Sequence, residues 1–292
     1  MSRPVAVGVD GSPEAVAAAT WAAGEAVLRG TKLRIVYAAQ SPGPATAQSG
    51  SFEARSHWAE DLLAEAVTAV RRERPSLEIE SRHRSGHPFE VLADEASEAG
   101  LLVLGSRGLG GVGGFLLGSV GMATISATER PVVLVRAPER PDAADGALPA
   151  GPARDVVVGA DLDQFFAPLL DFAFQEAVLR GDRVLVLYGW SIMPVVRDAS
   201  ALVAAEREMG PGVARRLTEA LKPWRHKFPS IEVAERTPIG GPARLLLRAA
   251  DNADLVVVGR RVRKGSLGAH VGSVTHALIH HCPAPVAVIA HE

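Results

Sequence analysis

Residues 101–120 combine an apolar run, a glycine-rich loop and a serine that opens a helical pattern. The apolar run, Leu101 to Leu104, is typical of a buried strand, which we expect Gly105 to end. Glycine lets main-chain N–H groups approach an anion, and a helix N-terminus adds unpaired donors and the positive end of the helix dipole. The stretch therefore predicts a site for phosphate groups.

The spacing of these glycines is more specific than their number. Gly105, Gly108 and Gly118-Ser119 form the pattern G-x2-G-x9-G-S. This pattern resembles the ATP-binding signature of the universal stress protein family. Neither a Walker A pattern nor G-x-G-x-x-G after the first strand occurs in the chain. The alternative is a glycine loop without a ligand, because such loops are common in α/β connections.

Alternating strands and helices must position this loop. The apolar periodicity predicts strands over 5–9, 32–39, 77–84, 101–104 and 131–135, and helices over 13–29, 55–74, from 88 onward and over 119–128. Segment 41–51, rich in proline, glycine and serine, is expected to be a surface loop. This alternation predicts an α/β fold, a doubly wound, five-stranded parallel sheet with helices on both faces.

The whole pattern occurs twice. Val156 to Asp161 matches Val5 to Asp10, and the segment EAVLRG at 25–30 returns unchanged at 176–181. We therefore expect a nucleotide-binding domain over 1–137, a linker over 138–153 and a second such domain over 154–292. The resemblance extends over nearly the whole chain and is to the tandem, two-domain type of universal stress protein.

Ligands of a doubly wound sheet bind at the carboxyl ends of its strands, where the strand order reverses. The resemblance implies that Asp10 accepts a hydrogen bond from adenine or ribose while the glycine loop holds phosphates. Alternatively, Asp10 only caps the turn before the first helix, and Gly8 only allows close packing. The first-domain candidates for nucleotide binding are Gly8, Asp10, Ala38, Gly105, Ser106, Arg107, Gly108, Gly118, Ser119 and Val120.

The second copy departs from the motif because Val262 replaces its second glycine, and valine adopts positive φ only with strain. Arginines and a lysine around Val262 can compensate by pairing with phosphate oxygens, or they form a solvated surface. We expect this site to be weaker or more salt-sensitive. The second-domain candidates are Gly159, Asp161, Gly189, Gly259, Arg260, Arg261, Gly272, Ser273 and Val274.

The composition excludes several classes of protein. A net charge of −2 gives no general attraction to nucleic acid or anionic membranes. The single cysteine, Cys282, suits a reducing compartment, and the chain has neither a signal-peptide pattern nor an apolar run of the ~18 residues that span a bilayer. We expect a cytoplasmic protein. His276, His280 and His281 lack a third ligand at useful spacing, so no metal site is expected.

The resemblance implies a regulatory protein of stress, dormancy or growth control that binds ATP, with or without Mg²⁺. It also implies a homodimer that pairs through the end strands 131–135 and 285–289, and a downstream protein partner that the sequence does not identify. A two-domain monomer is the alternative assembly. Alternative functions are an ATP-using α/β enzyme, or a structural dimer module with a vestigial second site. The loop lacks a P-loop lysine and a carboxylate, so turnover far below the ~10 s⁻¹ of typical enzymes is expected.

Overall fold

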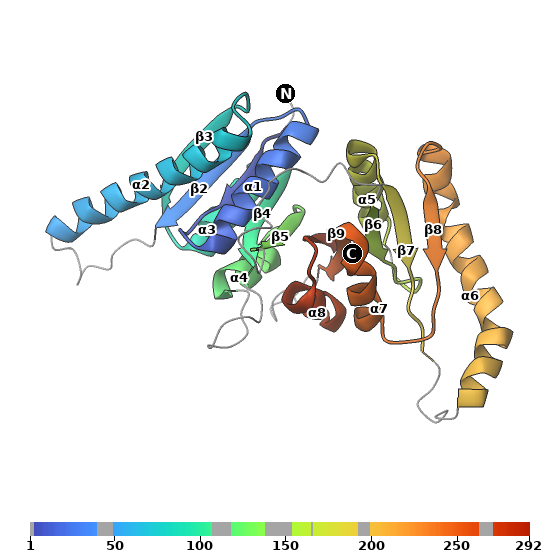
Figure 1. Cartoon of the computed structure of the whole chain (residues 1–292). Coiled ribbons are helices and arrows are strands. Elements are labelled where there is room, and N and C mark those ends of the chain that lie inside the picture. The colour runs from blue at the N-terminus through green and yellow to red at the C-terminus, as the bar shows by residue number, and fades with distance from the viewer. Residues whose placement is uncertain are drawn as a thin grey trace. The chain divides into compact units, whose positions relative to one another are not determined.

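The computed structural model describes residues 3–39, 49–106, 118–137, 154–164, 166–191, 199–262 and 271–292, without the side chains of 49–56 and 199–202. The chain divides into two compact units (Figure 1). We call them the first unit, described within residues 3–137, and the second unit, described within residues 154–292. The expected linker over 138–153 lies outside the described residues.

The first unit alternates strands and helices. Its elements are β1 (Val5–Gly8), α1 (Pro13–Leu28), β2 (Leu33–Ala39), α2 (Ser49–Glu73), β3 (Ile79–Ser85), α3 (Pro88–Glu98), β4 (Leu101–Ser106), α4 (Ser119–Ala127) and β5 (Val132–Arg136). The strands pair in parallel in the order β3-β2-β1-β4-β5. The strand order therefore reverses at β1, whose neighbours are β2 and β4, as the sequence predicted.

The second unit repeats this arrangement. Its elements are β6 (Asp155–Gly159), α5 (Ala167–Arg180), β7 (Arg183–Leu187), α6 (Ala199–Lys227), β8 (Val233–Arg236), α7 (Pro242–Ala249), the 3₁₀ helix η2 (Ala250–Asn252), β9 (Ala253–Arg261), α8 (Ser273–His281) and β10 (Val286–His291). The strands pair in parallel in the order β10-β9-β6-β7-β8. The prediction of two doubly wound α/β copies is confirmed.

The core of each unit consists of the central strands and the helix faces that cover them. Val5 to Val7 in β1 and Val156 to Val158 in β6 are at most 1% exposed. Strands buried on both faces consist of continuous apolar runs, which is why the sequence pattern located them. Helix α1 packs against β1 and β4 with a face of alanines, whose small side chains bring the helix close to the sheet (Figure 1).

Two predicted boundaries in the first unit are wrong. Strand β4 does not end at Gly105 but continues to Ser106, because Gly105 and Ser106 pair with Val135 and Arg136 of β5. Helix α2 begins at Ser49, inside the segment expected to be a loop, while residues 40–48 lie outside the described part of the chain. Among the described residues, no helix is both long enough and apolar enough to cross a bilayer.

Candidate nucleotide site

A cavity of about 470 Å³ lies at the carboxyl ends of β6, β7 and β9 in the second unit. Strand β6 is where the strand order of this unit reverses, which is the usual place for a ligand in a doubly wound sheet. The structure brings eight second-domain candidates together in its lining: Gly159, Asp161, Gly189, Gly259, Arg261, Gly272, Ser273 and Val274.

Arg260 is the second-domain candidate that the structure does not bring to the cavity. It lies in β9 between Gly259 and Arg261, which both line the cavity, and its own side chain is only 3% exposed. Successive side chains of a strand point to opposite faces of the sheet, so Arg260 is turned away from the cavity. The expected phosphate contact of Arg260 does not fit this arrangement.

Helix α8 presents its N-terminus to the cavity. Gly272 is the N-cap and Ser273 the first helical residue, and both are exposed. The Thr275 hydroxyl donates a hydrogen bond to the Gly259 carbonyl oxygen over 2.6 Å, which fastens the first turn of α8 to β9. The first N–H groups of a helix have no partner inside it, so together with the positive end of the helix dipole they favour an anion at this end of the cavity.

Gly272 has no structural reason to be glycine among the described residues. Its φ of −59° suits any residue, and a Cβ built on it would meet no described atom within 4 Å. The same absence of neighbouring atoms holds for Gly118, the N-cap of α4 in the first unit. The open space at both helix starts leaves room for a bound group close to the backbone.

Other candidate glycines have a packing role. A Cβ on Gly159 would lie 2.9 Å from Leu246 Cδ1, and a Cβ on Gly8 would lie 2.9 Å from Leu92 Cδ2. A Cβ on Gly189 would lie 3.0 Å from Pro242 Cα. These glycines bring the strand ends close to α3 in the first unit and to α7 in the second, so the packing interpretation of Gly8 and Gly159 accounts for their identity.

The side of the cavity formed by the ends of β6 and β7 carries an acid, a phenol and an apolar wall. Asp161 Oδ1 accepts a hydrogen bond from the Asp163 backbone N–H over 3.1 Å, which shapes the turn after β6. Burial raises the pKa of the Tyr188 phenol above its usual value, and the charges of Asp163 and Asp161 raise it further, so the hydroxyl stays a donor. Leu187 and Leu246 supply apolar lining. This side can accommodate a nucleoside, with its flat base and its hydroxyl groups.

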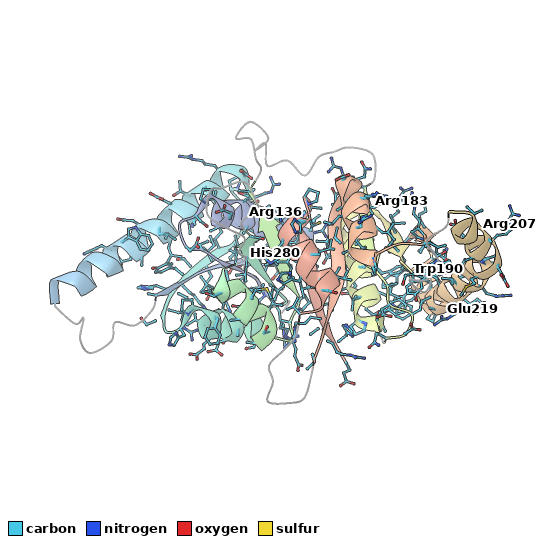
Figure 2. All side chains as sticks on the ribbon, turned by 90° about the horizontal axis from the view of Figure 1, so that it is seen from below. Arg136, Arg183, Trp190, Arg207, Glu219 and His280 are labelled. Carbon is cyan, nitrogen blue, oxygen red and sulfur yellow. The ribbon has the colours of Figure 1, made fainter. Side chains whose placement is uncertain are left out.

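The turn beyond β7 is held by Trp190, which Figure 2 labels. Its indole Nε1 donates to the Thr237 carbonyl oxygen over 2.8 Å, and only 7% of its surface is exposed. A bridge between Trp190 and Ile239 continues the pairing of β7 and β8 past their ends. The indole therefore fixes the backbone beside Gly189. The exposed Arg207 and Glu219 lie on α6 (Figure 2).

The first unit places its candidates differently. Asp10 Oδ1 accepts hydrogen bonds from the Ser12 backbone N–H over 3.0 Å and from the Ser12 hydroxyl, and the Ser12 side chain caps α1. The aspartate thus stabilises the turn, as its capping interpretation predicts. Gly118 and Ser119 are exposed at the start of α4, where Val120 follows, while Ser106 is 2% exposed. Ala38 lies in β2, and Arg107 and Gly108 lie outside the described residues.

The two units differ at the start of their first helix, which is α1 in the first unit and α5 in the second. A Cβ on Gly105 would lie 2.6 Å from the Glu14 carbonyl carbon, so the first turn of α1 packs directly on β4. When the repeats are aligned on their shared EAVLRG segment, Ala15 corresponds to Phe166, and α5 begins only at Ala167. The second unit therefore lacks this helical turn at the place where its cavity lies.

Sequence reasoning missed Tyr188, Gln164, Thr275 and His291 among the cavity residues. Tyr188 aligns with Tyr37 of the first repeat, so the duplication offered a signal for it. Thr275 and His291 have no such signal, because the first repeat carries Gly121 and Ala137 at their positions. In the described part of the chain, no group of three or more histidine, cysteine or acidic side chains is placed to hold a metal ion.

Comparison with known proteins identifies close relatives over the whole length. A model of the universal stress protein family matches residues 1–136 and 152–290. Universal stress protein Rv2005c of Mycobacterium tuberculosis is 32% identical over 308 residues, covering 99% of each chain. Universal stress protein Rv1996 of the same organism is 33% identical, covering 97% of this chain and 94% of that protein. A solved universal stress protein from Archaeoglobus fulgidus shares the fold, with a TM-score of 0.71 over all of both chains at 17% identity.

Proposed function

The chain belongs to the universal stress protein family, and we propose that its second unit binds an adenine nucleotide in the cavity beside α8. The observation that carries the proposal is the open space at Gly272, at a helix N-terminus that lines a cavity of about 470 Å³. Eight positions chosen from sequence motifs also line this cavity. The motif spacing and the cavity lining agree, which supports a ligand with phosphate groups.

We assign the two sides of the cavity to the two parts of a nucleotide. The N-terminus of α8, with Ser273, and the Arg261 guanidinium would hold the phosphates, because both offer donors and positive charge. Asp161 and Tyr188 would meet the ribose and base, and the leucines beside them would cover the flat ring. Gly118 and Ser119 at the start of α4 support a second nucleotide in the first unit.

We further propose that the chain acts in the stress response through binding and association rather than through turnover. Backbone donors at a helix start hold the ground state and the transition state alike, and such uniform binding gives no rate acceleration. The one carboxylate among the described cavity residues, Asp161, is already engaged in the turn after β6. ATP, with or without Mg²⁺, is the ligand we expect, with ADP and cyclic nucleotides as the alternatives to be tested.

Calorimetric titration of the full chain with ATP, ADP and cyclic AMP tests the binding proposal. Gly272→Val places a branched side chain in the space that we assign to the phosphates and should abolish binding to the second unit. Gly241→Val is the matched control, because Gly241 is also a helix N-cap in open space but does not line the cavity. Absence of saturable binding by the unaltered chain, or equal binding by the Gly272→Val variant, would refute the assignment.

Two further measurements test the mode of action. Release of inorganic phosphate from ATP at enzyme-like rates, lost in the Gly272→Val variant, would establish the enzyme alternative. Light scattering tests the proposed homodimer: a mass near 30.6 kDa at all concentrations would show a monomer instead.

A further inference from the structure

His291 lies at the end of β10 and lines the cavity of the second unit. Its neighbour in the parallel pairing with β9 is Arg261, so imidazole and guanidinium belong to adjacent strand ends. A Cβ on Gly259 would lie 2.6 Å from His291 Nε2, which means that the absence of a side chain at Gly259 makes room for the ring. The imidazole is therefore seated at a defined place in the cavity wall.

The first unit carries no counterpart of this imidazole. Gly105 pairs with Val135 and Gly259 pairs with Ile289, so Ala137 occupies the position that corresponds to His291. The space over Gly105 is filled by the backbone of α1 instead. A titratable side chain at this point is thus specific to the second unit within the described residues.

The hydrogen bond of the ring determines which nitrogen carries the proton. His291 Nδ1 lies 3.1 Å from the main-chain oxygen of Glu292. This oxygen only accepts, so Nδ1 is the donor, and the neutral ring presents the lone pair of Nε2. Nε2 then repels an anionic oxygen. Protonation converts Nε2 into an N–H donor and adds a positive charge beside Arg261.

A phosphate in the cavity would change the charge around the ring. The charged groups that line the cavity with His291 are Arg261 on β9, the positive end of α8 and Asp161 after β6. Gln164 is neutral and forms a hydrogen bond with Arg261. An incoming phosphate adds negative charge and an acceptor, so it favours the imidazolium.

We propose that protonated His291 binds a phosphate group of the ligand, so that anion binding in the second unit takes up a proton. This inference rests on the proposed function, because it assumes that the cavity holds a nucleotide. It adds that the second unit responds to pH as well as to nucleotide concentration. Affinity at this unit should rise as the pH falls, by up to ~10-fold per pH unit for one linked proton.

Calorimetry in two buffers of different ionisation enthalpy measures the protons taken up on binding. Both proteins carry Gly118→Val, which should remove binding to the first unit, so that the calorimetric signal comes from the second unit. His291→Gln keeps a polar side chain of similar size that does not titrate. We expect ATP to bind with greater proton uptake in the His291 protein than in the His291→Gln variant. Subtracting the proton uptake of the variant from that of the His291 protein cancels the protons that ATP itself exchanges with the solvent. Adenosine, which has no phosphate, should show no such difference.

The possible outcomes distinguish failure of this inference from failure of the proposed function on which it rests. If the second unit binds ATP but His291→Gln leaves proton uptake and pH dependence unchanged, the role of His291 is refuted and the nucleotide site stands. If the unaltered chain shows no saturable binding at any pH between 6 and 8, the proposed function fails, and the inference fails with it. His291→Ala should reproduce the His291→Gln result, since both remove the imidazole.

Discussion

The two units share their order of elements and differ in what lies above one glycine at the carboxyl edge of the sheet. In the first unit the backbone of α1 packs on Gly105; in the second, the His291 ring lies at Gly259 and a cavity opens beside it. The change comes from the start of α5, which is later in the aligned repeat than the start of α1. A duplicated fold can therefore cover the same glycine with helix backbone in one copy and with side chains in the other.

The units also differ in what stabilises their second strand, which is β2 in the first unit and β7 in the second. In the first unit the fully buried Glu95 carboxylate forms ion pairs with Arg34, Arg82 and Arg84 at 2.8–3.1 Å. In the second unit, Leu185 stands in the aligned position of Arg34 and is buried. Glu80 and Glu98 share two of these arginines and have lowered pKa values, so acid weakens the ionic part of the first unit's stability, whereas apolar packing does not titrate.

The largest expected effect comes from adding one methyl group at each of the two glycines. Gly105→Ala would press Cβ against the Glu14 backbone, which cannot move without shifting α1, and should destabilise the first unit by about 3 kcal/mol. Gly259→Ala would meet the end of the His291 side chain, which can rotate away, and should destabilise the second unit by about 1 kcal/mol. Urea unfolding with hydrogen exchange assigns each loss to its unit; equal losses would contradict the comparison.

A smaller effect is expected from replacing Glu80, which forms ion pairs with Arg34 and Arg82 in the first unit. Hydrogen bonds from Lys32 and Arg82, together with the charge of Arg34, lower its pKa from 4.5 to about 2. A lowered pKa stabilises the fold above the unfolded value, and this stabilisation is lost as the pH falls from 4.5 towards 2. Glu80→Gln should cost about 1–2 kcal/mol at pH 7, after allowance for partial exposure.

The pH series provides the control for Glu80. The difference between Glu80→Gln and the unaltered chain should shrink below pH 4.5 and vanish near the folded pKa of about 2. A difference in unfolding free energy that stays constant from pH 7 to pH 3 would show that packing rather than charge is responsible.

The smallest expected effect is a stabilisation of the second unit. Thr31 of the first unit donates its hydroxyl proton to the Arg3 carbonyl oxygen, whereas Asp182 at the aligned position accepts from the Arg154 backbone N–H. Asp182 Oδ2 is buried without a hydrogen-bond partner, and burial and the charge of Asp254 raise the pKa of this carboxyl. Asp182→Asn keeps the acceptor and removes the buried charge.

A raised pKa means that ionised Asp182 destabilises the fold as the pH rises from the unfolded pKa through the folded one. Asp182→Asn should therefore stabilise the second unit by about 1 kcal/mol at pH 7 and by nothing below the unfolded pKa. Thermal unfolding at pH 7 and pH 3 measures both values. Destabilisation at pH 7 would contradict this account of Asp182.

The sequence predicted the fold well because buried parallel strands and repeated motifs leave periodic signals. It selected eight positions that line the second-unit cavity because Gly272-Ser273 retains the spacing of Gly118-Ser119. It could not predict that Arg260 faces away, since that depends on strand register, nor that His291 enters the cavity, since that depends on a strand far along the chain. The packing of the α1 backbone on Gly105 could not be predicted either, because it results from tertiary structure rather than from a local sequence pattern.

The central claim is that the N-terminus of α8 receives the phosphates of an adenine nucleotide. Titration of ¹⁵N-glycine-labelled protein with ATP, followed by NMR, tests it most directly, because the amide of Gly272 lies at the proposed contact. We predict a saturable shift of the Gly272 signal together with those of Gly259 and Gly189, which line the cavity, while Gly241 stays in place. A titration that saturates while the Gly272 signal does not move would contradict the account.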